Sequence, residues 1–242
     1  MRRPRVFTDQ PLQPGGAVEL AEGPARHLVR VLRMRPGDAV VLFNGDGHDY
    51  SGALTEAAGR SCRVEIKEAT PAETESPLEI SLVQGIARGE RMDWAIQKAV
   101  ELGAGHIQPV FTERTEVRLD PRRAERRLAH WQQVMIAACE QCGRARIPSL
   151  ATPIRLQDLP APTGLGLCLD PRSERTLSQL RDQPAKPVSL VIGPEGGLAD
   201  AELDSLQARG FVGLRLGPRV LRTETAGAAA IAVLQALWGD WK

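Results

Sequence analysis

The sequence predicts an α/β protein in two parts: a small β-barrel at residues 1–70 and a larger domain with a parallel sheet at residues 78–242. In the first part, apolar and polar residues alternate with a period of two, as they do in half-buried strands. In the second part, apolar strand segments alternate with helical segments, which is typical of a parallel sheet with helices on both faces. The polar, proline-containing segment between the two parts predicts a linker at residues 71–77.

The composition is that of a globular protein. Of the 242 residues, 42% are hydrophobic and 25% are charged, which argues against a disordered or fibrous chain, and the length suffices for two domains. No apolar run is long enough to cross a membrane, and residues 1–4 lead into no hydrophobic signal segment. We therefore expect a cytoplasmic protein with no membrane partner.

The barrel is predicted from a hairpin, a further strand and one helix. Two alternating runs, 39–43 and 49–54, flank Asn44-Gly45-Asp46-Gly47, a turn sequence with glycines where positive φ is needed. A third alternating run covers residues 62–68. The segment "PARHLVRVLRM" predicts a helix that ends at Arg35-Pro36-Gly37. We expect its apolar face to consist of Leu28, Val31 and Leu32, and its basic side to carry His27, Arg30 and Arg33.

The second part contains five predicted strands and three long helices. A short helix is expected between the third and fourth strands, and a helical pattern follows the fourth. The predicted strands cover residues 78–84, 106–111, 164–170, 188–192 and 213–217. The predicted long helices cover residues 90–103, 122–141 and 223–238.

Arginine is concentrated in two segments. Residues 1–35 contain seven Arg against three acidic residues, and residues 114–146 contain eight Arg against four, with no Lys in either segment. Guanidinium groups bind phosphate oxygens in pairs of hydrogen bonds and stack on bases, so both segments are candidates for RNA contact. A solvated helix face remains the alternative for each.

The four cysteines do not predict a disulfide framework or a metal site. Cys139 and Cys142 have CxxC spacing, but the sequence has no second such pair and no nearby His to complete a ligand set. The pair also lies late in a helical pattern, whereas a redox pair opens a helix. We interpret both as small helix residues, with a redox function as the alternative, and expect no metal.

A glycine-rich turn follows the predicted strand 188–192. Gly193-Pro194-Glu195-Gly196-Gly197 joins that strand to a helix, at an edge where ligands settle in open α/β sheets. Glycine permits positive φ and lets the backbone approach a ligand. The turn lacks the Lys of a phosphate loop, and Glu195 would repel phosphates. This favours a neutral or cationic ligand, and S-adenosylmethionine, with its positively charged sulfonium, meets that description.

The segment "LRLGPRVLRTETA" supplies a second loop at the same edge. Its apolar residues Leu216, Val220 and Leu221 could wall an adenine pocket, beside the polar residues Arg222, Thr223, Glu224 and Thr225. Small residues, with Gly227 among the alanines, fill the first turns of the next helix and allow another backbone to approach closely. High intrinsic helix propensity is the alternative explanation of the alanines.

These motifs resemble a known family. "VIGPEGGL" and "LRLGPRVLRTETAGAAAI" are similar to the closing signature of SPOUT-class RNA methyltransferases. With "RHLVRVLRMRPGD", "QKAVELG" and "EQCGR", the chain resembles the RsmE-type 16S rRNA (uracil-N3)-methyltransferases over almost its whole length. Cys142 departs from the Ser or other small residue expected in that last motif.

The resemblance implies a SPOUT α/β trefoil-knot domain preceded by a PUA-like barrel. It implies S-adenosyl-L-methionine as cofactor, a homodimer formed through the C-terminal knot helix, and 16S rRNA as substrate. The two separate arginine-rich segments favour the assembled small ribosomal subunit as the form of that substrate, with free rRNA as the alternative. The implied cofactor-binding residues are Leu169, Ile192, Gly193, Pro194, Glu195, Gly196, Gly197, Leu216, Gly217, Val220, Leu221, Thr223, Thr225 and Ala226.

Methylation of uridine N3 requires removal of a proton and stabilisation of the resulting anion. Arg222 is the candidate for anion stabilisation, with a structural ion pair to Glu224 or Glu195 as the alternative. Glu195 and Glu140 are candidate proton acceptors, and water beside an Arg is a third possibility. The candidate RNA-binding residues are Arg5, His27, Arg30, Arg33, Gln141 and Arg144. A packed helix position is the alternative for His27.

Two other functions stay open at this point. One is methylation of a ribose 2′-hydroxyl by an enzyme of the same fold, and the other is RNA binding by a protein with an inactive knot. The complete set of loop glycines argues against the second.

Overall fold

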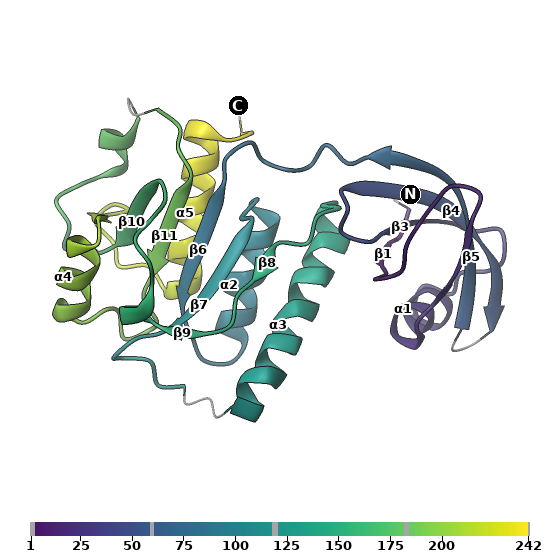
Figure 1. Ribbon diagram of the computed structural model, residues 1–242, viewed down its shortest axis with the longest axis horizontal. Coiled ribbons are helices and arrows are strands. Elements are labelled where there is room, and N and C mark those ends of the chain that lie inside the picture. The colour runs from purple at the N-terminus through teal and green to yellow at the C-terminus, as the bar shows by residue number, and fades with distance from the viewer. Residues whose placement is uncertain (1–2, 59–60, 118–120, 182–183, 242) are drawn as a thin grey trace. The chain divides into compact units, whose positions relative to one another are not determined.

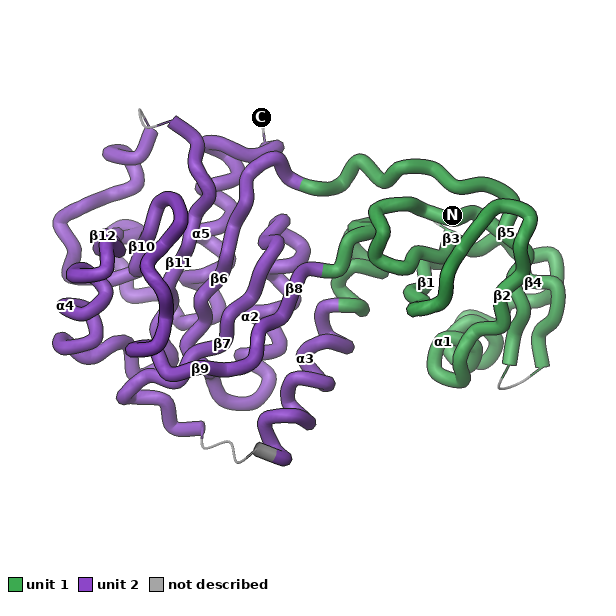
Figure 2. Tube along the Cα trace, in the orientation of Figure 1, with its two compact units in different colours: residues 1–75, 136–147 green, residues 76–135, 148–242 purple. Residues whose placement is uncertain are grey.

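A computed structural model describes residues 3–58, 61–117, 121–181 and 184–241. Arg2, Arg118 and Asp120 of the two arginine-rich segments lie outside these ranges. The chain divides into two compact units, residues 1–75 with 136–147 and residues 76–135 with 148–242 (Figure 2). Residues 136–147 thus join the N-terminal unit, although they fall within the predicted domain range 78–242. No helix in the described ranges is both long enough and apolar enough to span a bilayer.

The first unit contains a five-stranded sheet in the order β1-β3-β4-β5-β2 (Figure 1). β3 and β4 pair in antiparallel fashion, which confirms the predicted hairpin. Val40, Leu42, Leu54, Val64 and Ile66 point into its core and are at most 2% exposed. The strands are β1 (Arg5–Phe7), β2 (Ala17–Leu20), β3 (Ala39–Phe43), β4 (His48–Ala58) and β5 (Ser61–Pro71).

The helix of this unit differs from its prediction. α1 (Glu22–Arg26) continues into a π-helical turn, His27–Val31, in which the N–H of Leu32 bonds the carbonyl of His27 at 3.0 Å. A π-turn adds a residue to the helical repeat and rotates the side chains that follow. Leu28 is buried as expected, but Val31 and Leu32 are 65% and 43% exposed.

The helix also ends earlier than Arg35. Arg33 has a φ of 56°, in the left-handed region that non-glycine residues rarely occupy, and the N–H of Met34 bonds the carbonyl of Leu28 at 3.0 Å. The chain therefore leaves the helix before it reaches Pro36. His27, Arg30 and Arg33 are all exposed.

Two buried arginines hold the segment 136–147 to the sheet of the first unit. The Arg144 guanidinium donates to both carboxylate oxygens of Glu75, at 2.6 and 3.2 Å, and its side chain is 5% exposed. Arg5, at 7% exposure, pairs with Asp49 and donates to the carbonyl of Arg144 at 3.1 Å. Both arginines were predicted to contact RNA. The burial of both guanidinium groups against carboxylates argues against that role.

The second unit contains a parallel sheet in the order β12-β10-β11-β6-β7-β8, with β9 also paired to β7 (Figure 2). The strands are β6 (Ile80–Gly85), β7 (His106–Phe111), β8 (Ser149–Leu150), β9 (Ile154–Arg155), β10 (Leu165–Leu169), β11 (Val188–Ile192) and β12 (Phe211–Leu214). The helices are α2 (Glu90–Glu101), α3 (Pro121–Cys142, whose last turns belong to the first unit), α4 (Asp200–Ala208) and α5 (Thr223–Trp238), with short 3₁₀ helices at Leu156–Asp158 and Leu177–Leu180.

Helices cover both faces of this sheet, as predicted. Val83 and Val191 belong to one core cluster with Leu206 of α4. Their neighbours Leu82 and Ile192 approach Gly227 of α5, since a Cβ at that glycine would lie 3.8 and 3.7 Å from their side chains. Successive residues of a strand point to opposite faces, so α4 and α5 lie on opposite sides of the sheet.

Replacing Arg144 should destabilise the first unit. Arg144→Met leaves the Glu75 carboxylate without its buried cation, and breaking such a pair costs about 3 kcal/mol. Urea unfolding followed by circular dichroism measures the change. Arg146→Met, which removes an exposed arginine two residues away, should shift stability by less than about 0.5 kcal/mol. Equal stability of the two variants would show that the Arg144–Glu75 pair does not hold this segment.

Candidate functional site

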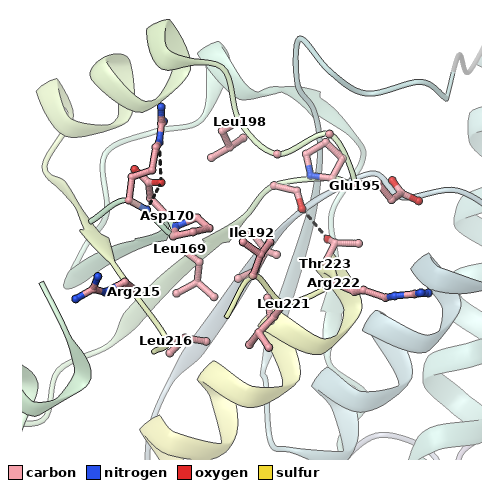
Figure 3. A pocket seen from close by; sticks show the side chains of 18 of the residues that line it. Leu169, Asp170, Ile192, Glu195, Leu198, Arg215, Leu216, Leu221, Arg222 and Thr223 are labelled. Atoms are coloured by element: carbon pink, nitrogen blue, oxygen red, sulfur yellow. Dashed lines mark hydrogen bonds and ion pairs between the residues drawn. The ribbon is translucent and has the colours of Figure 1, made fainter. Parts of the chain in front are cut away.

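A cavity of about 730 Å³ opens where three neighbouring parallel strands end (Figure 3). Its walls come from the segments that follow β10, β11 and β12, together with the first turn of α5. The volume lies within the range of small-molecule sites, and the carboxyl ends of strands are where open α/β sheets hold ligands.

Nearly all the predicted cofactor-binding residues line this cavity. The lining includes Leu169, Ile192, Gly193, Pro194, Glu195, Gly196, Gly197, Leu216, Gly217, Val220, Leu221, Thr223 and Ala226. Thr225 is the exception, because it is exposed and does not belong to the lining. α5 begins at Thr223, and two residues along a helix correspond to a rotation of about 200°, so Thr225 points away from the side that Thr223 faces.

Glycine is needed in this turn for two reasons, a positive φ at one position and close backbone packing at another. The N–H of Gly197 bonds the carbonyl of Pro194 at 2.9 Å, and Gly197 has a φ of 69°. Gly193 has no positive φ, but a Cβ there would lie 3.1 Å from backbone atoms of Gly197 and Leu198. The expectation of positive φ is therefore met at one glycine, while Gly193 is needed because the chain folds back onto it.

A buried chain of hydrogen bonds joins this turn to α5. The Gln84 side-chain amide donates to the Thr223 hydroxyl at 2.9 Å, and that hydroxyl donates to the carbonyl of Gly193 at 2.6 Å. Gln84 is fully buried and Thr223 is 6% exposed. Gln84 was not among the predicted site residues, although a polar residue at the end of the apolar strand "ISLV" was a signal that could have identified it.

Glu195 is held by an ion pair. Its carboxylate accepts hydrogen bonds from Arg91 Nη1 and from the Arg88 N–H, each at 3.0 Å. Partial burial alone would raise the pKa of Glu195, but these hydrogen bonds and the charge of Arg91 lower it below its ordinary value. A carboxylate with a lowered pKa is a weak proton acceptor. The structure therefore argues against Glu195 as the base.

Arg222 precedes the first residue of α5 and lines the cavity while remaining exposed. Figure 3 shows its side chain directed away from Ile192 and Leu221. Within the described ranges it forms no ion pair with Glu224 or Glu195, which argues against a structural ion pair as its role. Its guanidinium remains available to an incoming ligand.

Other charged residues of the lining were not predicted. Arg172 bridges Asp170 at 3.3 Å and Asp200 at 2.7 Å, and Arg114 donates to the carbonyl of Gly196 at 3.0 Å. Two polar atoms of the lining are buried without a hydrogen-bond partner among the described residues. They are Arg215 Nε and Glu224 Oε2.

The remaining predicted residues lie in the first unit. Burial raises the pKa of Glu140, although its carboxylate accepts a hydrogen bond from the Phe7 N–H at 3.0 Å. Gln141 is exposed. Burial also raises the pKa of Cys139 to about 12, which makes a reactive thiolate unfavourable there. The part of the chain that the structure describes contains no cluster of metal-ligating side chains.

Comparison with known proteins identifies the family. Residues 74–235 match the RNA methyltransferase domain family, and residues 24–67 match the RNA methyltransferase PUA domain family. Over 242 residues, 99% of the chain, it is 32% identical to ribosomal RNA small subunit methyltransferase E of Buchnera aphidicola, of which 98% is covered. The chain belongs to the ribosomal RNA small subunit methyltransferase E family.

Solved structures agree with this family assignment. A methyltransferase of Legionella pneumophila, determined with bound SAM, is 39% identical and superposes with a TM-score of 0.94 over 99% of this chain and 100% of its own. A ribosomal RNA small subunit methyltransferase E of Neisseria gonorrhoeae, bound to S-adenosyl methionine, is 38% identical, with a TM-score of 0.91 and full coverage of both chains. The predicted fold class, a PUA-like domain followed by a SPOUT α/β trefoil-knot domain, is confirmed.

The hydrogen-bond chain through Thr223 should contribute to stability. Thr223→Val keeps the side-chain shape but removes one of the two hydrogen bonds that the buried Gln84 amide donates, the other going to the Gly85 carbonyl, and it removes the hydroxyl that donates to the Gly193 carbonyl, at a cost of about 2 kcal/mol. Chemical unfolding measures this loss. Thr225→Val, on the exposed side of the same helix turn, is the matched control and should change stability by less than about 0.5 kcal/mol. A similar loss of stability in both variants would show that the hydrogen bonds through Thr223 do not contribute to stability.

Proposed function

We propose that the protein uses S-adenosyl-L-methionine to methylate N3 of a uridine in 16S rRNA. Membership of the ribosomal RNA small subunit methyltransferase E family supports the RNA substrate, and two solved relatives contain the cofactor. The observation that carries the proposal is the cavity itself, because the motif residues named from the sequence gather around it.

The lining fits the cofactor. Leu169, Ile192, Leu216 and Leu221 form apolar walls suited to adenine, and the backbone of the glycine turn offers N–H and carbonyl groups to its base edge (Figure 3). Arg215 Nε has no hydrogen-bond partner among the described residues, so it can donate to the carboxylate of the bound cofactor. Bound there, S-adenosyl-L-methionine supplies an electrophilic methyl group on a positively charged sulfur.

Arg222 is the residue proposed to stabilise the uridine anion. N3 lies between two carbonyls, and loss of its proton spreads negative charge over O2 and O4. An exposed guanidinium on the lining, without an ion pair among the described residues, can approach those oxygens. Glu140 stays a candidate for the proton acceptor, since its raised pKa suits a base.

The exposed π-helical turn of the first unit is the proposed RNA contact. His27, Arg30 and Arg33 present basic groups, while Val31 and Leu32 expose apolar surface beside them. Arginine neutralises phosphates, and apolar side chains can pack against unpaired bases. Gln141 is exposed and stays in the proposal, whereas Arg5 and Arg144 leave it because they are buried.

We further propose a homodimer formed through α5. Ala229, Ala232, Val233 and Ala236 are partly or fully exposed on this helix, and Trp94 of α2, which packs against α5, is 42% exposed. A face of small apolar side chains allows a second copy to approach closely. A cytoplasmic location and an assembled small ribosomal subunit as substrate complete the proposal.

Incubation of the protein and cofactor with small ribosomal subunits should methylate one uridine of the 16S rRNA. Methylation at N3 blocks Watson–Crick pairing, so primer extension should stop next to the modified base, and mass spectrometry of the nucleosides should show 3-methyluridine. Subunits incubated without cofactor are the control. Ribose methylation would favour the 2′-hydroxyl alternative. Cofactor-free RNA binding would favour the inactive-knot alternative.

Arg222→Ala should reduce methyl transfer far more than cofactor binding. Loss of one group that stabilises developing charge lowers kcat by about 10²- to 10³-fold. Single-turnover methylation measures the rate, and calorimetry measures cofactor affinity, which should change by less than about twofold. Arg181→Ala, an exposed arginine outside the cavity, is the control. A normal rate for Arg222→Ala would remove Arg222 from the mechanism.

A further inference from the structure

Four carboxylates of the described residues line the cavity, and three of them form ion pairs with arginines of the protein. Asp170 and Asp200 share Arg172, at 3.3 and 2.7 Å. The Glu195 carboxylate accepts hydrogen bonds from the Arg91 side chain and from the Arg88 N–H. These three carboxylates therefore have little need of a cation from a ligand.

Glu224 is the fourth carboxylate, and its Oε2 atom has no hydrogen-bond partner in the part of the chain that the structure describes. It is the second residue of α5, it lines the cavity, and its Oε2 atom is buried with no hydrogen bond among the described residues. None of the nearby arginines, Arg215, Arg219 and Arg222, forms an ion pair with it within those ranges. A buried carboxylate oxygen is unfavourable unless a positive or hydrogen-bonding group is supplied.

A purely local role does not account for this arrangement. An acidic residue in the first turn of a helix interacts favourably with the helix dipole, but that interaction leaves the buried Oε2 atom of Glu224 without a hydrogen bond among the described residues. Glu90, the first residue of α2, and Asp200, the first residue of α4, also lie in helix first turns, and both are exposed. Burial of an unpaired oxygen at Glu224 points to a ligand in the cavity.

We propose that Glu224 is the counter-charge of the cofactor sulfonium, an inference that rests on the proposed function. S-adenosylmethionine carries one more positive charge than its demethylated product, S-adenosylhomocysteine. The apolar side chains Leu169, Ile192 and Leu221 limit solvent screening in the cavity, which strengthens attraction between the carboxylate and the sulfonium. Methyl transfer removes that charge, so Glu224 favours binding of the cofactor over retention of the product.

Calorimetry with three ligands tests the assignment. The ligands are S-adenosylmethionine, S-adenosylhomocysteine, and an analogue in which a protonated amine replaces the sulfonium methyl group. Glu224→Gln should weaken both cationic ligands by about tenfold and change the affinity for the neutral product by less than about twofold. Glu90→Gln removes an exposed carboxylate from a helix first turn outside the cavity and should leave all three affinities unchanged.

The outcomes separate this inference from the proposed function. Equal weakening of all three ligands by Glu224→Gln would overturn it, because ribose hydroxyls, which all three share, would then be the partner. Failure of the unaltered protein to bind any of the three would overturn the proposed function itself. If the Gln variant does not fold, Glu224→Asp, which retracts the charge by one methylene, must still weaken the cationic ligands more than the product; equal affinities would refute the assignment.

Discussion

The buried hydrogen-bond chain from Gln84 through Thr223 to the Gly193 carbonyl is the constraint on which the site depends. It joins the end of β6, the start of α5 and the turn after β11, three segments far apart in the sequence. Buried polar groups need partners, so the turn and the helix cannot shift independently without leaving one of these groups unsatisfied. A Cβ at Gly85 would lie 2.6 Å from the Pro194 nitrogen, so close packing confines the same turn from the other side.

Some charged residues around the cavity are paired with other groups of the protein and so shape the cavity, whereas others are left for a ligand. Arg91, Arg114 and Arg172 are engaged by Glu195, by a backbone carbonyl, and by Asp170 with Asp200. These contacts fix the loops to one another. Arg222 and Glu224, which are without ion-pair partners in the described ranges, carry opposite charges on either side of Thr223, the first residue of α5. An RNA anion and a sulfonium cation need that combination within one site.

Local sequence patterns predicted much of this structure. They did not predict side-chain pairs between residues that are far apart in the sequence. The alternation in residues 39–54 predicted the hairpin, and the glycine turn together with the segment 216–226 predicted the cavity. Each of these signals depends on residues that are consecutive in the sequence. Arg5 and Arg144 look like RNA-binding residues until their partners are known, and Glu75 lies 69 residues from Arg144. The π-turn at 27–31 was likewise not predicted, because the spacing of apolar residues in so short a helix does not distinguish its hydrogen-bond pattern from that of an α-helix.

The placement of residues 136–147 in the first unit has a consequence for biosynthesis. Phe7 and Arg5 are translated more than 130 residues before their partners Glu140 and Arg144. The N-terminal sheet can begin to form once β5 is complete, but its closing contacts must wait until residue 147 has left the exit tunnel. A nascent chain paused before that point therefore carries an unfinished first unit, with the Phe7 amide still bonded to water.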